Sequence, residues 1–139
     1  MDNILLTKEW IDDDLVELKV EASSKFVKAF QYCYMDIKNI NAIGQALSQY
    51  AGSLIEQSYF EFGVKNGNST PAFSLNLIPV DKLGHIQVEI DLEIDDNNDR
   101  IHRCVFYVNT ELGCINNWGK AITALSSGVL GMQCTLNPE

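Results

Sequence analysis

The chain has 139 residues, of which 46% are hydrophobic and 21% are charged, so it is large enough to bury a core and is not globally disordered. Its 19 acidic residues outnumber its 10 lysines and arginines and give a formal charge of −9, which opposes binding to nucleic-acid phosphates. This acidity either favours a basic partner or simply keeps the chain in solution.

The start of the chain, Met1 to Trp10, has neither a basic region nor a long apolar run. No segment approaches the ~18 apolar residues of a membrane-spanning helix. We therefore expect a cytoplasmic protein with no membrane partner. Four cysteines are scattered without a CxxC pair, which predicts reduced thiols rather than a disulfide framework.

The first half of the chain predicts two strands and a helix. After the acidic run at residues 12–14, residues 15–22 alternate between apolar and polar, and residues 25–35 are rich in aromatic side chains that favour strands. Asp36 is a suitable N-cap, and Gly52 is a suitable stop, for a helix between them. Apolar side chains at spacings of three and four form one stripe of this helix: Ile37, Ile40, Ile43, Leu47 and Tyr50.

The second half predicts four strands and a second helix. The strands cover residues 58–64, 72–80, 86–94 and 101–108, and Pro79 marks a strand end or a sheet edge. Thr110 can cap the helix, whose stripe is Leu112, Ile115, Gly119, Ile122 and Leu125. Residues 126–139 have no clear period, so we expect an irregular tail or a short strand.

The order of elements, ββα-ββββ-α, predicts an α+β fold. Without strand–helix–strand alternation a doubly wound parallel sheet is disfavoured. We expect a single domain over residues 1–139. Its core would be one mostly antiparallel sheet of about six strands with two helices packed on one face. No internal repeat is visible.

Residues 86–94 are the most informative segment. Even positions are aliphatic and odd positions are polar or acidic, which is typical of a strand with one buried and one wet face. If Arg103 on the next strand pointed inward it would bury an unpaired charge, so we expect it outward near Asp91 or Glu93. That register places Val105 and Tyr107 on the acidic face too. The predicted binding residues are Glu89, Asp91, Glu93, Val105 and Tyr107. The alternative is an ordinary solvated sheet, on which a few apolar residues are normal.

No pattern predicts a catalytic residue, a metal or a cofactor. Asp95-x-Asn97-x-Asp99 begins like a calcium loop but lacks the glycine and glutamate that such a loop needs next. The imidazoles His85 and His102 are too few for a three-histidine zinc site, and their positions predict opposite sheet faces. A solvated acidic loop also explains the run Asp12–Asp14 better than a cation site does.

Three short motifs resemble those of a small bacterial domain family of unknown function: Trp10-Ile11-Asp12-Asp13-Asp14, Phe60-Glu61-Phe62-Gly63 and Gly84-His85-Ile86-Gln87-Val88. The resemblance covers roughly residues 10–125. It implies a free-standing bacterial domain with no assigned reaction, so it assigns no catalytic residue. In composition the chain is also similar to small acidic immunity proteins that neutralise secreted toxins.

We interpret the chain as a non-enzymatic intracellular bacterial protein that binds a protein partner with a basic surface, as an immunity protein does. Two alternatives stay open. One is a small-molecule binder or small enzyme with a pocket near His85, Trp10 and the Asp12–Asp14 loop. The other is a homodimer that uses its outer sheet face or an edge strand against a second copy.

Overall fold

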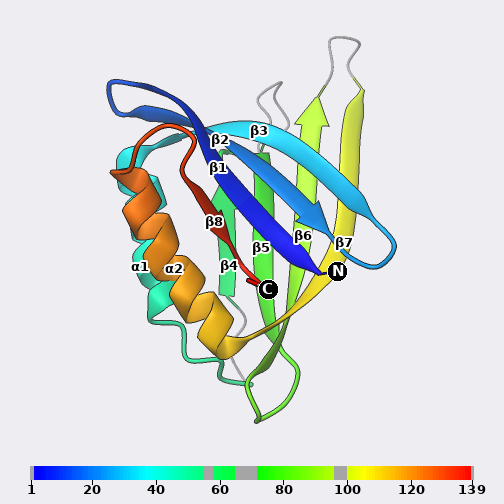
Figure 1. The fold of residues 1–139 in the computed structure, drawn as a ribbon. Helices are drawn as coiled ribbons and strands as arrows, with labels where there is room; N and C mark the ends of the chain where they lie inside the picture. Colours follow the sequence, from blue (N-terminus) through cyan, green and yellow to red (C-terminus); the bar gives the residue numbers. More distant parts are fainter. Residues whose placement is uncertain (1, 55–57, 65–71, 96–99, 139) are drawn as a thin grey trace.

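The computed structural model describes residues 2–54, 58–64, 72–95 and 100–138, leaving aside the side chains of residues 94, 95 and 101 (Figure 1). These described residues form two helices and eight strands. The elements are β1 (Asn3–Asp12), β2 (Leu15–Ser23), β3 (Lys28–Asp36), α1 (Ile37–Ser48), β4 (Ser58–Phe62), β5 (Ala72–Pro79), β6 (His85–Asp95), β7 (Ile101–Glu111), α2 (Leu112–Ser126) and β8 (Gln133–Thr135).

The strands form two antiparallel sheets of four strands, in the orders β3-β2-β1-β8 and β4-β5-β6-β7; we call them sheet 1 and sheet 2. The prediction of one sheet of about six strands is therefore wrong, although the α+β class and the antiparallel pairing are confirmed. Alternation of apolar side chains shows that a strand has a buried face, but it does not show which strands share a sheet.

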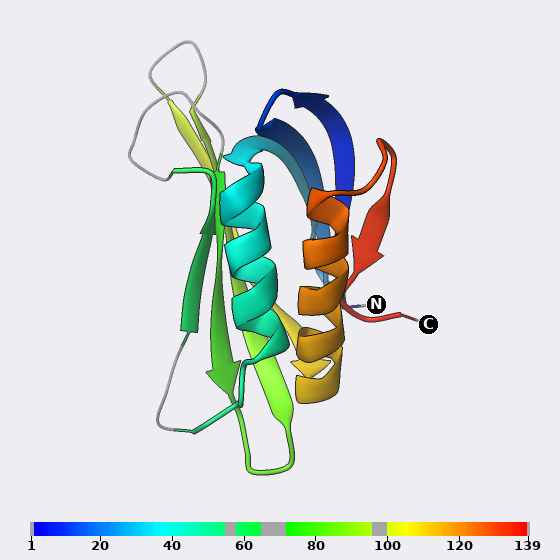
Figure 2. The same ribbon diagram turned by 90° about the vertical axis from the view of Figure 1, so that its left-hand side faces the viewer.

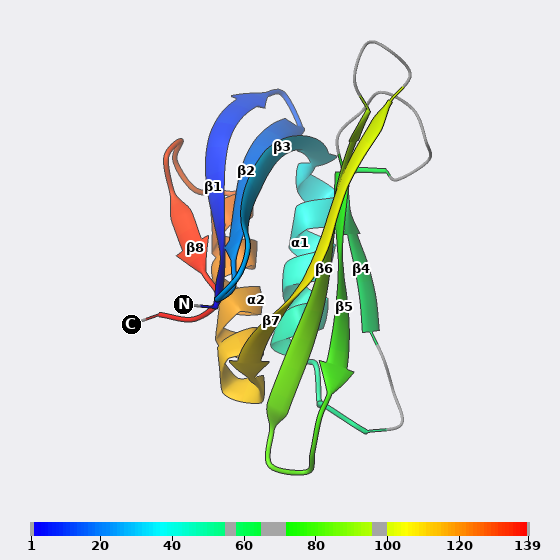
Figure 3. The same ribbon diagram turned by 90° about the vertical axis from the view of Figure 1, so that its right-hand side faces the viewer.

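The two sheets face each other, and the helices lie side by side along one side of the space between them (Figures 2 and 3). The inner faces of both sheets and the facing sides of both helices contribute to one hydrophobic core. In β6 the even positions are buried from residue 86 to residue 92, as the alternation predicts. The side chain of residue 94 lies outside the described part.

The sequence interpretation missed β1 and left β8 open. In β1 the alternation is interrupted, because Lys8 occupies an inward position and is only 2% exposed. The predicted tail contains β8, which pairs with β1 through Leu6 and Cys134. Part of the predicted tail is therefore the fourth strand of sheet 1.

The fold repeats itself although the sequence does not. Three consecutive strands lead into a helix, and the strand after that helix joins the other sheet: β1-β2-β3-α1 is followed by β4, and β5-β6-β7-α2 by β8. Equivalent strands have the same register. Within sheet 1 Val20 pairs with Leu6 and with Gln31, and within sheet 2 Ile90 pairs with Leu75 and Phe106. Each half of the chain therefore completes the sheet of the other half.

The helix crossing obeys the same repeat. Gly44 lies seven positions after the start of α1 at residue 37, and Gly119 lies seven after the start of α2 at residue 112. A Cβ on Gly44 would lie 2.8 Å from the carbonyl oxygen of Gly119, and one on Gly119 would lie 2.6 Å from that of Gly44. Such reciprocal contacts are typical of a twofold interface, here formed within one chain.

Within the described part of the chain, neither helix is long and apolar enough to cross a membrane.

Candidate functional site

The five predicted binding residues lie together on the outer face of sheet 2, which no described helix covers (Figure 3). Glu89, Asp91 and Glu93 come from β6, and Val105 and Tyr107 come from β7. Val105 pairs with Asp91, and Tyr107 pairs with Glu89. The side chains of Val105 and Tyr107 are 47% and 46% exposed. The predicted register of this hairpin is therefore confirmed, and a role in binding stays a prediction.

Arg103 binds one of the carboxylates of this face. It pairs with Glu93 across the strands, and its guanidinium donates two hydrogen bonds to the Asp91 carboxylate, one of them from Nε at 3.0 Å. The hydrogen bonds to Asp91 raise the pKa of the Arg103 guanidinium. Because Asp91 is nearly buried, this charge would be costly without its partner. The pair therefore links β6 to β7 and neutralises one acid.

Tyrosine hydroxyls hold two further carboxylates. Tyr107 donates to Glu89 at 2.8 Å, and Tyr59 on β4 donates to Glu61 at 2.9 Å. The hydrogen bond from Tyr107 to Glu89 raises the pKa of the phenol. Both rings lie in one row across the sheet, because Asn76 pairs with Tyr59 and with Glu89. The exposed aromatic groups are thus held in place rather than loosely solvated.

The chemistry of this face suits docking. Glu89, Asp91 and Glu93 lie near the Arg103 guanidinium, and Glu61 lies on β4 in the same row of the sheet as Asp91, so this face carries an excess of negative charge. Acid–base catalysis instead needs a concave, desolvated setting, which an open sheet face does not provide. In the described part of the chain, no group of three or more His, Cys, Asp or Glu side chains is placed to hold a metal ion.

The structure does not bring together the residues of the predicted alternative pocket. The Asp12–Asp14 turn joins β1 to β2 at one end of the molecule, and His85 follows the turn between β5 and β6 at the opposite end (Figure 1). Trp10 lies on the outer face of sheet 1, where its ring meets the Tyr34 ring edge-on at 6.4 Å. His85 instead bonds to Asp81, with Nδ1 2.6 Å from the carboxylate oxygen.

Sequence reasoning missed an aromatic row on the outer face of sheet 1. Phe30, Tyr32 and Tyr34 alternate along β3 and are at least partly exposed, with Phe30 at 64%. Lys19 lies over the Phe30 and Tyr32 rings, at 5.2 and 5.9 Å from their centroids. The alternation within residues 28–36 carries this signal, but it becomes readable only once the inward positions of the strand are known.

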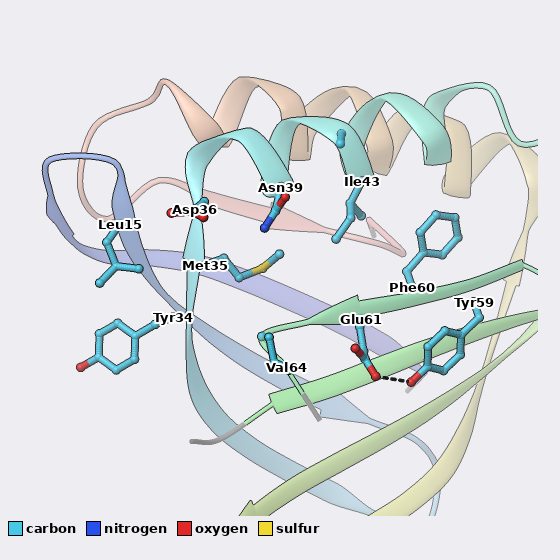
Figure 4. Close-up of a pocket in the computed structure, with 12 residues that line it drawn as sticks. Leu15, Tyr34, Met35, Asp36, Asn39, Ile43, Tyr59, Phe60, Glu61 and Val64 are labelled. Carbon is cyan, nitrogen blue, oxygen red and sulfur yellow. Dashed lines mark hydrogen bonds between the residues drawn. The ribbon is translucent and has the colours of Figure 1, made fainter. Parts of the chain in front are cut away.

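A groove of about 470 Å³ opens between the end of β3, the first turns of α1 and β4 (Figure 4). No sequence pattern indicated it, because its walls come from segments about 25 residues apart that belong to different sheets. Apolar groups of Met35, Ile43 and Phe60 line it, together with the carboxylates of Asp36 and Glu61.

The chain matches no protein-family model, and comparison with curated proteins and with solved structures likewise found no match. The resemblance to a small bacterial domain family therefore stays a prediction.

Proposed function

We propose that this chain is a non-enzymatic protein-binding module of the bacterial cytoplasm, which uses the outer face of sheet 2 to bind a partner with a basic surface. This is the mode of action of an immunity-like protein. The observation that carries the proposal is a pair of exposed apolar side chains, Val105 and Tyr107, fixed within a cluster of carboxylates on an uncovered sheet face.

Two physical effects support this role. Complementary charge speeds the encounter of two proteins, and the excess of carboxylates on this face would select a basic partner. Exposed aromatic groups that are already held in one conformation lose little entropy on binding, and tyrosine is enriched among the residues that contribute most to interfaces. The hydrogen bond from Tyr107 to Glu89 provides this preorganisation.

The test compares capture of partner proteins from the native host by the wild-type chain and by a double variant, Val105→Ser with Tyr107→Ser. A second variant, Glu89→Lys with Glu93→Lys, tests the charge. Asp91 is left unchanged in both, because removing it would leave Arg103 without its partner. We expect both variants to lose the same captured protein.

The matched control carries Glu17→Lys with Glu21→Lys on the outer face of sheet 1, where the same change of charge should leave capture intact. A photo-crosslinking residue at position 107 should link directly to the captured protein. Unchanged capture by both sheet 2 variants would reject this face as the binding surface.

A further inference from the structure

Because the fold repeats, the groove beside β4 in the first half can be compared with the equivalent place in the second half. The equivalent place in the second half lies between the end of β7, the first turns of α2 and β8. There the side chain of Asn137 accepts a hydrogen bond from the Thr110 hydroxyl at 2.6 Å and donates to the carbonyl of Asn109 at 2.9 Å. Asp2 accepts from the Asn109 amide at 2.8 Å. Side chains from the two ends of the chain thus satisfy the free edge of β7.

The corresponding positions in the first half follow from the register. Asn109 and Tyr34 each lie three residues before a helix start, and they pair with equivalent residues of the neighbouring strands. Ile37 donates its amide to the carbonyl of Asp14 at 2.9 Å, and Leu112 makes the equivalent bond to Gly84 at 2.8 Å. The main-chain groups of β3 therefore point toward and away from the neighbouring strand at the same positions as those of β7. The amide and carbonyl of Tyr34, like those of Asn109, point away from the neighbouring strand, which for Tyr34 is β2.

The first half has a glycine at the position that corresponds to Asn137, whose side chain bonds to the edge of β7 in the second half. Asn137 lies three positions after Cys134, which pairs with Leu6, and Gly63 lies three positions after Phe60, which pairs with Leu75. Gly63 has no side chain to reach β3. The groove lies where the second half places the Asn137 amide, and Gly63 is one of the residues that line it.

The groove has an apolar floor and acidic sides. Met35 is nearly buried, and Ile43 and Phe60 pack partly into the core. Figure 4 shows Asp36 at the end of the groove nearest β3 and Glu61 on β4. Both charged residues among the described ones that line the groove, Asp36 and Glu61, are acidic, and the whole chain carries a formal charge of −9.

We propose that this groove binds an extended segment of a partner protein, in which basic side chains flank an apolar one. The segment adds to the edge of β3, so that its main chain bonds to the amide and carbonyl of Tyr34 as the side chains of Asp2 and Asn137 bond to Asn109. Its apolar side chain rests on Met35 and Ile43, and its basic side chains meet the acidic sides of the groove. Addition of a strand to a sheet edge combines main-chain affinity with side-chain selection in this way.

The probe is a blocked seven-residue peptide of sequence Lys-Val-Lys-Leu-Lys-Val-Lys, titrated into the full-length chain and followed by amide NMR signals. We expect saturable shifts at Tyr34, Met35, Asn39 and Phe60. An acidic analogue with glutamate in place of lysine should not bind. An analogue with a methylated leucine amide should bind about tenfold more weakly, because it loses a main-chain hydrogen bond.

Gly63→Asn is the decisive variant, because it copies the residue that closes the second half. Gly63 has φ +80°, a region that asparagine tolerates better than other side chains do. We expect the variant to bind the peptide at least about tenfold more weakly. Gly131→Asn is the matched control. Gly131 has φ +87°, no neighbouring atom lies within 4 Å of a Cβ built on it, and it is not one of the residues that line the groove. This control should bind like the wild type.

Asp36→Asn provides a second variant that does not depend on backbone geometry, and it should weaken binding of the lysine peptide and reduce its dependence on salt. The serine variants at residues 105 and 107 should bind the peptide normally, which separates this proposal from the function proposed for sheet 2. No saturable shift, or shifts mapped to the outer face of sheet 2, would overturn the proposal. Concentration-dependent shifts at the groove without peptide would assign it to a second copy of the chain and also overturn it.

Discussion

At the scale of single residues, the pair of Asp81 and His85 is the clearest pH-sensitive element. The Nδ1 atom of His85 lies 2.6 Å from the Asp81 carboxylate, which also accepts hydrogen bonds from the amides of Leu83 and His85. The hydrogen bond to Asp81 raises the pKa of the imidazole, and the same bond lowers the pKa of the carboxyl group. Both groups are exposed, so the pair orders a turn and does not stabilise the core.

We predict that an NMR titration will give His85 a pKa above its ordinary value of 6.5, and that Asp81→Asn will return it toward that value. The raised histidine pKa means that this pair stabilises the fold below pH 6.5 and loses its effect as pH rises through the folded-state pKa. The lowered Asp81 pKa adds stability above the ordinary carboxyl pKa, which is lost as pH falls. An unchanged His85 titration in Asp81→Asn would show that the contact does not persist in solution.

Lys8 is the most unusual residue of the core. Its ammonium group donates to the carbonyl of Ser126, the last residue of α2, at 3.2 Å and to that of Gly128, just beyond the helix, at 2.8 Å. A positive charge is favourable at this end of a helix. The internal repeat places Leu77 at the equivalent position of β5, because Lys8 pairs with Leu18 and Leu77 pairs with Val88.

We predict that Lys8→Met, which preserves most of the side-chain volume, destabilises the chain by about 1–3 kcal/mol because the two carbonyls lose their charged donor. Urea unfolding followed by circular dichroism measures this difference. Lys28→Met is the matched control, because Lys28 is exposed at the start of β3, and it should change stability by no more than about 0.5 kcal/mol. Equal effects of the two substitutions would contradict the capping role.

At the scale of elements, the helix pair depends on two glycines. A Cβ on Gly119 would lie 2.3 Å from the amide nitrogen of Ser48, a contact that only a shift of the helices would relieve. Gly113, in the first turn of the same helix, has no neighbouring atom within 4 Å of such a Cβ. The two positions therefore separate packing from helix propensity.

We predict that Gly119→Ala destabilises the chain by about 1–3 kcal/mol or more through overpacking. Gly113→Ala should instead stabilise it by up to about 1 kcal/mol, because alanine has the higher helix propensity. Thermal unfolding of both variants provides the comparison. A stabilised Gly119→Ala chain would mean that the helices lie further apart than the structure shows.

Individual elements were largely predictable, because each has one apolar face. The stripe of the second predicted helix contains four of the residues that α2 buries, namely Ile115, Gly119, Ile122 and Leu125. Helix boundaries were less accurate. The N-cap position of α2 is Glu111 rather than Thr110, and neither helix has a side-chain hydrogen bond at its N-cap. Tertiary packing of the apolar face stabilises these helices more than local capping does.

At the scale of the whole molecule, the pairing of strands was not predictable from alternation. Period-two patterns define inner and outer faces, and so the outward positions of Glu89, Asp91 and Tyr107 could be predicted. They do not define sheet partners, and so two sheets were interpreted as one. The internal repeat was also invisible, since it preserves burial and register but exchanges residue types, as at Lys8 and Leu77.

The exchange of final strands between the halves has a consequence for folding. Of the described strands, residues 1–64 contain three of sheet 1 and only β4 of sheet 2, and residues 65–139 contain the rest. Neither part includes both helices, so each would expose the helix face that carries Gly44 or Gly119. Burial of that face and completion of each sheet require the other half.

We therefore predict that a fragment of residues 1–64 and a fragment of residues 65–139 each lack native structure when expressed separately, and that a mixture restores the native amide NMR spectrum as a one-to-one complex. Gly119→Ala in the second fragment should weaken this complex, whereas Gly113→Ala should not, since only the former disturbs the contact between the helices. A monomeric, native-like spectrum from either fragment alone would contradict the prediction. In that case the apolar surface shared by the halves would not be what holds the sheets together.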